Sequence, residues 1–141
     1  LEERLDEFKE RGVEVMTVSV DSPYTHLAYK RTQLKDGGIG EVRFPMISDL
    51  TRQIAKDYDV LFNNSIAYRG TFIIDQQGVV RHQTVNDLPL GRNVGEILRI
   101  IDALQFHQQH GEVCPANWNK GDEAIKATQE SVSKYLAKKA S

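Results

Sequence analysis

The apolar residues of this chain change their spacing several times, and the order of these changes restricts the fold more than any other feature. Leu1, Leu5 and Phe8 follow helical spacing. The β-branched residues within 13–20 are typical of a strand that is buried on both faces. Helix and strand patterns then alternate through the first half of the chain. This alternation predicts a parallel pair of strands covered by helices.

Local signals mark where the next elements begin. Ser22 is expected to cap a helix that has Pro23 at its first position. A strand is expected over residues 44–47, followed by a helix that Ser48 or Asp49 caps. The apolar residues expected on one face of that helix are Leu50, Ile54 and Tyr58.

The second half begins with a hairpin. Strands are expected over residues 71–75 and 79–85, with a glycine-containing turn between them. Residues 94–104 carry the clearest amphipathic helix, which Gly111 is expected to end. The stretch after Gly111 is polar and rich in lysine, and one weak helix is expected in it from about Asp122.

Together these elements predict a mixed α/β fold, with a central sheet, flanking helices and an extended C-terminal tail. The expected division is a folded domain over residues 1–110 and a tail over residues 111–141. The net charge of −2 argues against nucleic acid or an anionic membrane as partner, and no apolar run approaches a membrane-spanning length. A single cysteine gives no disulfide framework, so a reducing cytoplasm is the expected location.

The chain begins inside a helical pattern. Leu1 is not a methionine, and no capping residue stands before it. We therefore expect that further residues precede Leu1 in the complete protein.

Cys114 is the only cysteine in the sequence. A lone thiol is inert, acts as a nucleophile, or pairs with a thiol of another chain. Gly111 ends the preceding helix and Pro115 blocks a new one, which places the thiol on a loop or tail and favours pairing. Composition alone favours the alternative, a small hydrophobic residue in the interior.

Several segments, spread in order over nearly all of the chain before the tail, resemble one family. They are Val18–Ser22, Gly37–Gly40, Phe44–Met46, Tyr68–Asp75, Val85–Arg92 and His110–Trp118. By these segments the chain resembles the typical two-cysteine peroxiredoxins, especially the bacterial alkyl hydroperoxide reductase C group. The resemblance implies a thioredoxin-like fold and a thiol-dependent peroxidase that reduces hydrogen peroxide and organic hydroperoxides in antioxidant defence.

The reaction of that family uses two cysteines. A first, peroxidatic cysteine is oxidised to a sulfenic acid, and a resolving cysteine from the partner chain condenses with it to a disulfide. The resemblance implies that Cys114 is the resolving cysteine, whereas the first cysteine lies in the family just upstream of where this chain begins. The neighbours of Cys114 suit the second role, because Glu112 stands beside it and no lysine or arginine follows until Lys120.

Two arginines match the active-site arginines of the family. Arg69 is implied to favour the thiolate and to donate hydrogen bonds to the peroxide oxygens, and Arg92 is implied to support the same site. Without the resemblance, Arg69 is more simply a solvated surface arginine. The plain alternative for Arg92 is a charge at a helix start, where a cation is mildly unfavourable.

No cofactor or metal is expected. The sequence has no dinucleotide fingerprint, and none of its four histidines belongs to a metal-ligand pattern. The glycines over residues 37–40 are expected to form a flexible loop. They lack the spacing and the lysine of a phosphate-binding loop. The resemblance therefore implies a protein reductant, either thioredoxin or a flavin-containing disulfide reductase.

The strand over residues 79–85 carries neither proline nor lysine, the usual guards of a free edge. We expect it to pair with its copy in a second identical subunit, giving a dimer or a ring of dimers; the alternative is an edge covered by the chain's own tail. A different class of function, a thioredoxin-fold module that only binds partners or acts as a holdase, remains as the alternative to the enzyme.

Overall fold

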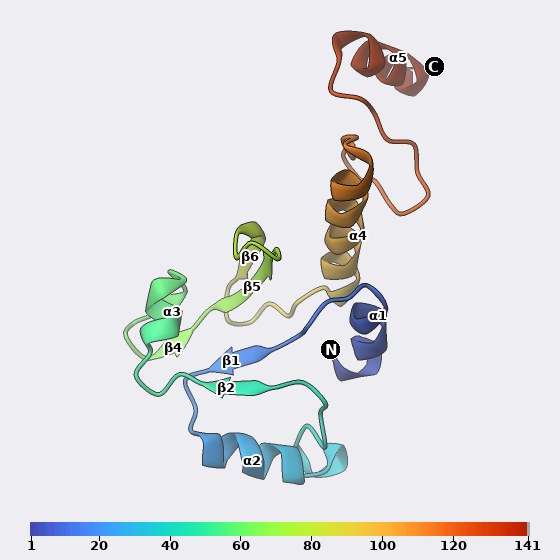
Figure 1. Cartoon of the computed structure of the whole chain (residues 1–141). Coiled ribbons are helices and arrows are strands. Elements are labelled where there is room, and N and C mark those ends of the chain that lie inside the picture. Colours follow the sequence, from blue (N-terminus) through green and yellow to red (C-terminus); the bar gives the residue numbers. More distant parts are fainter. Residues whose placement is uncertain (141) are drawn as a thin grey trace. The chain divides into compact units, whose positions relative to one another are not determined.

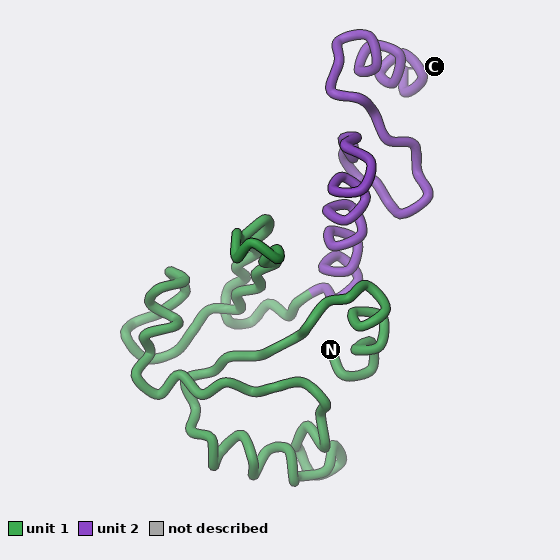
Figure 2. Tube along the Cα trace, in the orientation of Figure 1, with its two compact units in different colours: residues 1–92 green, residues 93–141 purple. Residues whose placement is uncertain are grey.

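The structure, a computed structural model, describes residues 1–140. It consists of two compact units, residues 1–92 and 93–141 (Figure 2). The domain boundary expected after residue 110 falls inside the second unit, at the end of a helix, and it stays a prediction. Within the described part, none of the helices is both long enough and apolar enough to cross a membrane.

The first unit is built from short helices and strands (Figure 1). In chain order they are the 3-10 helix η1 (Glu2–Arg4), α1 (Leu5–Glu10), β1 (Thr17–Ser19), α2 (Pro23–Arg31), the 3-10 helix η2 (Leu34–Asp36), β2 (Met46–Ser48), α3 (Gln53–Asp57), β3 (Leu61–Phe62), β4 (Ile66–Ala67), β5 (Arg69–Ile74) and β6 (Val80–Asn86). The second unit contains α4 (Val94–His110) and α5 (Gln129–Ala140).

The pairing of the strands confirms both expected motifs. β1 and β2 are parallel, with Val18 opposite Ile47. β5 and β6 form an antiparallel hairpin, with Thr71 opposite Thr84. A second hairpin, β3–β4, was not expected from the sequence.

The single central sheet, however, is not formed within residues 1–140, where the strands lie in three separate pairs. The expectation of a strand over 13–20 that is buried on both faces is wrong. β1 has only three residues, and Met16 and Val18 are 57% and 43% exposed. The reason is that β1 pairs with β2 alone among the described strands, and a sheet of two short strands does not bury both of its faces.

Caps explain where two of the helices begin. The Ser22 side chain accepts a hydrogen bond from the Thr25 amide, and Pro23 opens α2, as expected. The buried Asp49 carboxylate accepts from the amides of Ile54 and Ala55, at 3.1 and 2.8 Å. Asp49 therefore caps α3 although it lies four residues before the first residue of the helix, Gln53.

The apolar face expected for α3 is wrong at Leu50. Leu50 lies before the helix and is 55% exposed, so it does not share a buried face with Ile54. The chain between Asp49 and α3 turns through Arg52, which has a φ of 60°. Leu50 lies before this turn and outside the helix.

The glycines over residues 37–40 do not form a freely flexible loop, because backbone hydrogen bonds attach them to the end of α2. The amides of Gly38, Ile39 and Gly40 donate to the carbonyls of Gln33, Tyr29 and Thr32. A Cβ atom at Gly38 would clash with the carbonyl oxygen of Thr32. Glycine is therefore the residue that this close approach requires.

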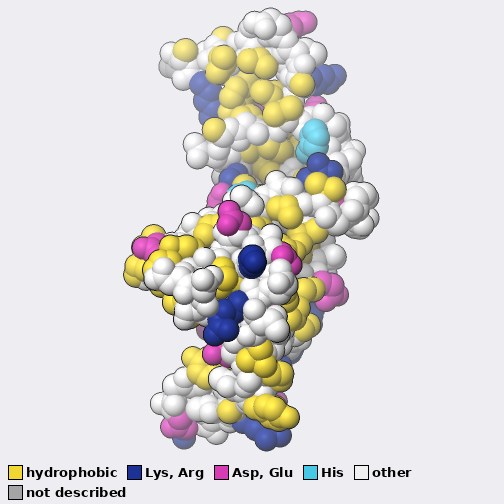
Figure 3. Space-filling view, turned by 90° about the vertical axis from the view of Figure 1, so that its left-hand side faces the viewer, with side chains coloured by type: hydrophobic (Ala, Val, Ile, Leu, Met, Phe, Trp, Pro, Cys, Tyr) yellow, Lys and Arg dark blue, Asp and Glu magenta, His cyan; other side chains and the backbone are white. Residues whose placement is uncertain are grey.

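The apolar core of the first unit is small. Leu5 of α1 packs with the buried Val42 and Phe44, which precede β2. Other apolar side chains remain on the surface, and Tyr24 and Leu34 are 84% and 77% exposed. The lower end of the space-filling view, over α2 and η2, shows this apolar surface (Figure 3).

The second unit starts with α4, the helix that the sequence predicts most clearly. The side chain of Asn93 caps it, and Gly111 ends it with a φ of 68°, as expected. α5 begins at Gln129 and not near Asp122, so the expected start is wrong. The reason is that residues before α5 make other hydrogen bonds: Val113 and Ile125 pair as an antiparallel bridge, and the Thr128 side chain accepts from the Ser131 amide.

Candidate functional site

The residues predicted for the site fall into two groups. Arg69 and Arg92 belong to the first unit, and Cys114 belongs to the second. Arg69 is the first residue of β5, and Arg92 lies in the segment between β6 and α4. The roles predicted for these three side chains stay predictions, and their surroundings show what each could do.

The structure brings the two arginines together at the start of β5. Arg69 donates from Nε to the carbonyl of Leu88, at 3.1 Å. Arg92 donates from Nε to the Thr71 hydroxyl at 3.1 Å and from Nη2 to the Gly70 carbonyl at 3.0 Å. The loop after β6 is thus tied to β5 by two guanidinium groups.

The electrostatics of the pair agree with a site for an electron-rich ligand. Partial desolvation lowers the pKa of Arg92, and the like charge of Arg69 lowers it further. Within the described residues, the terminal nitrogens of Arg69 have no hydrogen-bond partner. Two adjacent cations with N–H groups to spare can bind developing negative charge on oxygen.

Cys114 lies just after α4, on the chain that returns along this helix. Its side chain is half-buried, and Sγ donates a hydrogen bond of 3.6 Å to the carbonyl of Ala103. Burial raises the pKa of the Cys114 thiol, Arg99 lowers it, and Glu112 raises it. The net direction is upward, so the neutral thiol is favoured.

One residue near Cys114 was missed by the sequence analysis. Reading along the chain, no cation stands near the thiol before Lys120, but Arg99 of α4 is close enough to act on its pKa. Arg99 and Ala103 are four positions apart, so they lie on the same side of α4, one turn from each other. Only the return of the chain after Gly111 brings Cys114 to this side, and the sequence pattern carries no signal for that return.

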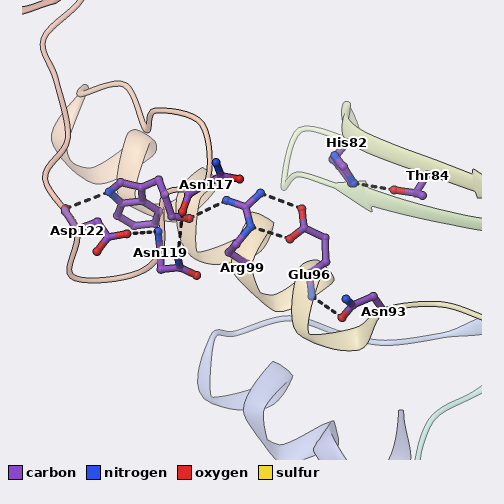
Figure 4. Close-up of polar contacts among 9 residues, drawn as sticks. His82, Thr84, Asn93, Glu96, Arg99, Asn117, Asn119 and Asp122 are labelled. Carbon is purple, nitrogen blue, oxygen red and sulfur yellow. Dashed lines mark hydrogen bonds and ion pairs between the residues drawn. The ribbon is translucent and has the colours of Figure 1, made fainter. Parts of the chain in front are cut away.

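An aromatic side chain closes this part of the unit. Trp118 is 2% exposed, and its ring lies 5.1 Å from that of Phe106 on α4. Its indole Nε1 donates to the carbonyl of Asp122 at 3.1 Å (Figure 4). The segment that carries Cys114 is therefore packed against α4 and is not a free tail.

The histidines show no sign of a metal site. His26 is buried on α2, and its Nε2 lies 2.6 Å from the hydroxyl of Ser19, while Nδ1 has no partner in the described chain. Among residues 1–140, no three side chains of the metal-binding types come together as a ligand set.

Known protein families and structures that resemble this chain identify the class of its fold. Residues 1–83 match the AhpC/TSA family, and residues 103–138 match the C-terminal domain of 1-Cys peroxiredoxin. The crystal structure of the 2-Cys peroxiredoxin of Plasmodium vivax, in its reduced form, superposes with a TM-score of 0.95 at 51% identity, over 96% of this chain and 70% of that one. The fold is thus that of the thioredoxin-like peroxiredoxins, which confirms the expected fold class.

Relatives of similar sequence agree with this class. The alkyl hydroperoxide reductase C of Helicobacter pylori is 53% identical over 96% of this chain and 68% of its own length. The mitochondrial thioredoxin-dependent peroxide reductase of Drosophila melanogaster is 50% identical over 96% of this chain and 59% of its own length. The chain belongs to the AhpC/TSA family of peroxiredoxins. Its function is that of a thiol-dependent peroxidase, and a module that only binds partners or acts as a holdase is not favoured.

Proposed function

We propose that this chain contributes the resolving thiol, Cys114, and a peroxide-binding pair of cations, Arg69 and Arg92, to a peroxidase assembled from identical subunits. The observation that carries the first part is the environment of Cys114. Its raised pKa and its hydrogen bond to Ala103 suit a thiol that waits for an activated partner. A thiol that attacks peroxide directly needs a lowered pKa.

The reaction balances with two thiols and one peroxide. A cysteine outside these 141 residues attacks one peroxide oxygen as thiolate, the O–O bond breaks, and the products are a sulfenic acid and an alcohol or water. The sulfur of Cys114 then attacks the sulfenic sulfur, a disulfide forms, and the oxygen leaves as water. Each turnover oxidises two thiols to one disulfide, which a dithiol protein must reduce again.

Arg69 and Arg92 support the first step in this proposal. The O–O bond places negative charge on the leaving oxygen as it breaks, and fixed cationic donors stabilise that charge. The N–H groups of Arg69 that have no partner in the described structure are available to such an oxygen. Arg92, which bonds to Thr71 and Gly70, holds the second charge beside it.

Two observations support the proposed reductant: the name of one relative, and a sequence without a dinucleotide fingerprint. A relative from Drosophila is named as dependent on thioredoxin. We therefore assign thioredoxin, or a flavin-containing disulfide reductase, as the dithiol partner, in a reducing compartment such as the cytoplasm.

The test is a peroxide-induced crosslink. The complete protein, treated with one equivalent of peroxide, should give a disulfide-linked dimer on a non-reducing gel. Cys114→Ser should lose that band and accumulate the sulfenic acid, which a dimedone probe detects. An equally strong dimer band in both proteins, at the position of the doubly linked species, would refute the assignment of Cys114.

A further inference from the structure

One arginine side chain helps to hold the segment that carries Cys114 on α4. Arg99 donates from Nη1 to the backbone carbonyl of Trp118, at 2.7 Å (Figure 4). Its Nε and Nη2 donate to the two carboxylate oxygens of Glu96, at 2.7 and 2.8 Å. Glu96 belongs to the first turn of α4. The guanidinium is therefore fixed on one side by its own helix and holds the returning chain on the other.

The carbonyl that Arg99 holds belongs to the turn that contains the thiol. Trp118 donates its amide to the carbonyl of Pro115, the residue directly after Cys114. The Cys114 Sγ donates to Ala103, one turn along α4 from Arg99. The thiol and the arginine thus hold the same short segment to the same helix at two points.

We propose that Arg99 is a positioning residue that keeps the segment 113–118 docked on α4 and thereby limits the release of Cys114. The inference rests on the proposed role of Cys114 as resolving thiol. A half-buried thiol that donates to α4 has to leave this position before it can bond to a thiol of another subunit. Hydrogen bonds with a charged donor are among the stronger ones, and the Arg99 side chain is only 25% exposed. Release of the segment therefore requires this bond to break, together with the packing of Trp118 on Phe106.

Two measurements on the reduced protein, without peroxide, report the release. The first is the rate of iodoacetamide labelling at Cys114, followed by mass spectrometry of its peptide over a range of pH. The rate at the high-pH plateau reports access to the thiolate, and the midpoint of the profile reports the pKa. The second is the emission and acrylamide quenching of Trp118, the only tryptophan among the 141 residues.

Arg99→Gln removes the charge and the hydrogen bond to Trp118. Its plateau rate should rise about tenfold or more, because the released form becomes more populated by the worth of one charge-assisted hydrogen bond. Trp118 emission should move to the red and be quenched more easily. Arg99→Lys keeps the charge but cannot hold Glu96 and Trp118 with one planar group, so a smaller rise is expected. Glu96→Gln weakens the ion pair that fixes the Arg99 side chain, so it should also raise the plateau rate.

Arg4→Gln is the matched control, because Arg4 also pairs with a glutamate three residues away, Glu7, but lies in the first unit. It should leave the plateau rate and Trp118 emission unchanged. An Arg99→Gln protein with an unchanged plateau and only a higher midpoint would overturn the proposal, since Arg99 would then act by charge alone. If Arg99→Gln does not fold, an unchanged plateau in both Arg99→Lys and Glu96→Gln overturns it. Loss or survival of the peroxide crosslink changes none of these readouts, so failure of the proposed function is distinguished from failure of this inference.

Discussion

At the scale of single residues, desolvation acts on the thiol and on one cation in the same sense. It favours the neutral form of each group, so it raises the pKa of Cys114 and lowers the pKa of Arg92. The charge of Arg69 lowers the pKa of Arg92 further, in the same direction as desolvation. The charge of Arg99 lowers the pKa of Cys114, against the effect of desolvation. Part of the electrostatics of these side chains is thus set by neighbours that are distant in the sequence.

The first prediction concerns the pH dependence of Cys114. In the native protein, labelling of Cys114 by iodoacetamide should reach half its plateau rate at a higher pH than in the same protein unfolded in urea, where the thiol titrates near its ordinary pKa of about 8.5. Because the folded pKa is raised, the stability that the neutral thiol contributes is fully present below the ordinary pKa and is lost as the pH rises through the raised one. Equal midpoints in the two states would contradict the raised pKa.

The second prediction concerns Arg69. Arg69→Lys should keep the fold but slow the oxidation of the first cysteine by roughly 10²-fold or more, because lysine does not reproduce a fixed planar donor for the developing charge. Stopped-flow fluorescence of the complete protein mixed with peroxide measures this step. Arg81→Lys is a suitable control, since Arg81 is on the same hairpin but pairs with Asp75. The same oxidation rate in wild type and Arg69→Lys would exclude Arg69 from the site.

The residues of the candidate site were predictable only in part. The motifs around Cys114, Arg69 and Arg92 singled out these residues, because family motifs are local in the sequence. The partners Leu88 and Arg99 could not be found in this way, since each contact depends on how a loop returns to its element. Periodicity describes the faces of an element, but not which loop will cover a face.

At the scale of elements, the strongest local signals were reliable. The Ser22 cap, the hairpin of β5 and β6 and the end of α4 at Gly111 lie where residue chemistry predicts them. The β3–β4 hairpin was missed although the sequence offers a signal. Asn63 and Asn64 both have a positive φ, 47° and 51°, and the Ser65 amide donates to the carbonyl of Phe62. This is the type I′ geometry that asparagine tolerates, and a pair of asparagines between short apolar runs indicates it.

The third prediction belongs to α3. Asp49→Ala should lower the free energy of unfolding by about 2 kcal/mol, because the buried carboxylate accepts two backbone amides at the start of this helix. Urea unfolding measures the change. Asp57→Ala is the control within the same helix: among the described residues its exposed carboxylate accepts only from the Gln53 side chain, and its loss should cost less than about 0.5 kcal/mol. Similar losses in the two variants would show that the Asp49 cap contributes little.

At the scale of the whole molecule, one feature that suggests assembly is the edge of β6 that no described strand pairs with. Among the described strands β6 pairs only with β5, and Val80 and Val85 are 43% and 47% exposed. The tail forms its bridge between Val113 and Ile125, within its own unit. An unguarded edge of this kind pairs readily with another strand, and its own copy across a two-fold axis gives a closed arrangement.

The fourth prediction is therefore a dimer in reducing buffer, held without a disulfide. Neighbouring amides of a strand point to opposite edges, so of His82→Pro and Gln83→Pro one removes a donor from the free edge and the other a donor to β5. The variant that removes a donor from the free edge should weaken the dimer and leave the hairpin intact. The variant that removes a donor to β5 should disturb the hairpin itself. Sedimentation and far-UV circular dichroism separate the two effects. A monomeric parent protein at micromolar concentration would count decisively against the interface.

The bridge between Val113 and Ile125 has a consequence for how the second unit can move. Each of these residues donates its amide to the carbonyl of the other, so the chain between them is a loop whose ends are already joined. The entropy of closing that loop is spent when the bridge forms, and it is not recovered when the loop leaves α4. Cys114 can therefore move away from α4 as part of a short closed loop while residues 126–140 keep their fold. Its release is then a local opening, and the length of the loop limits how far the thiol moves.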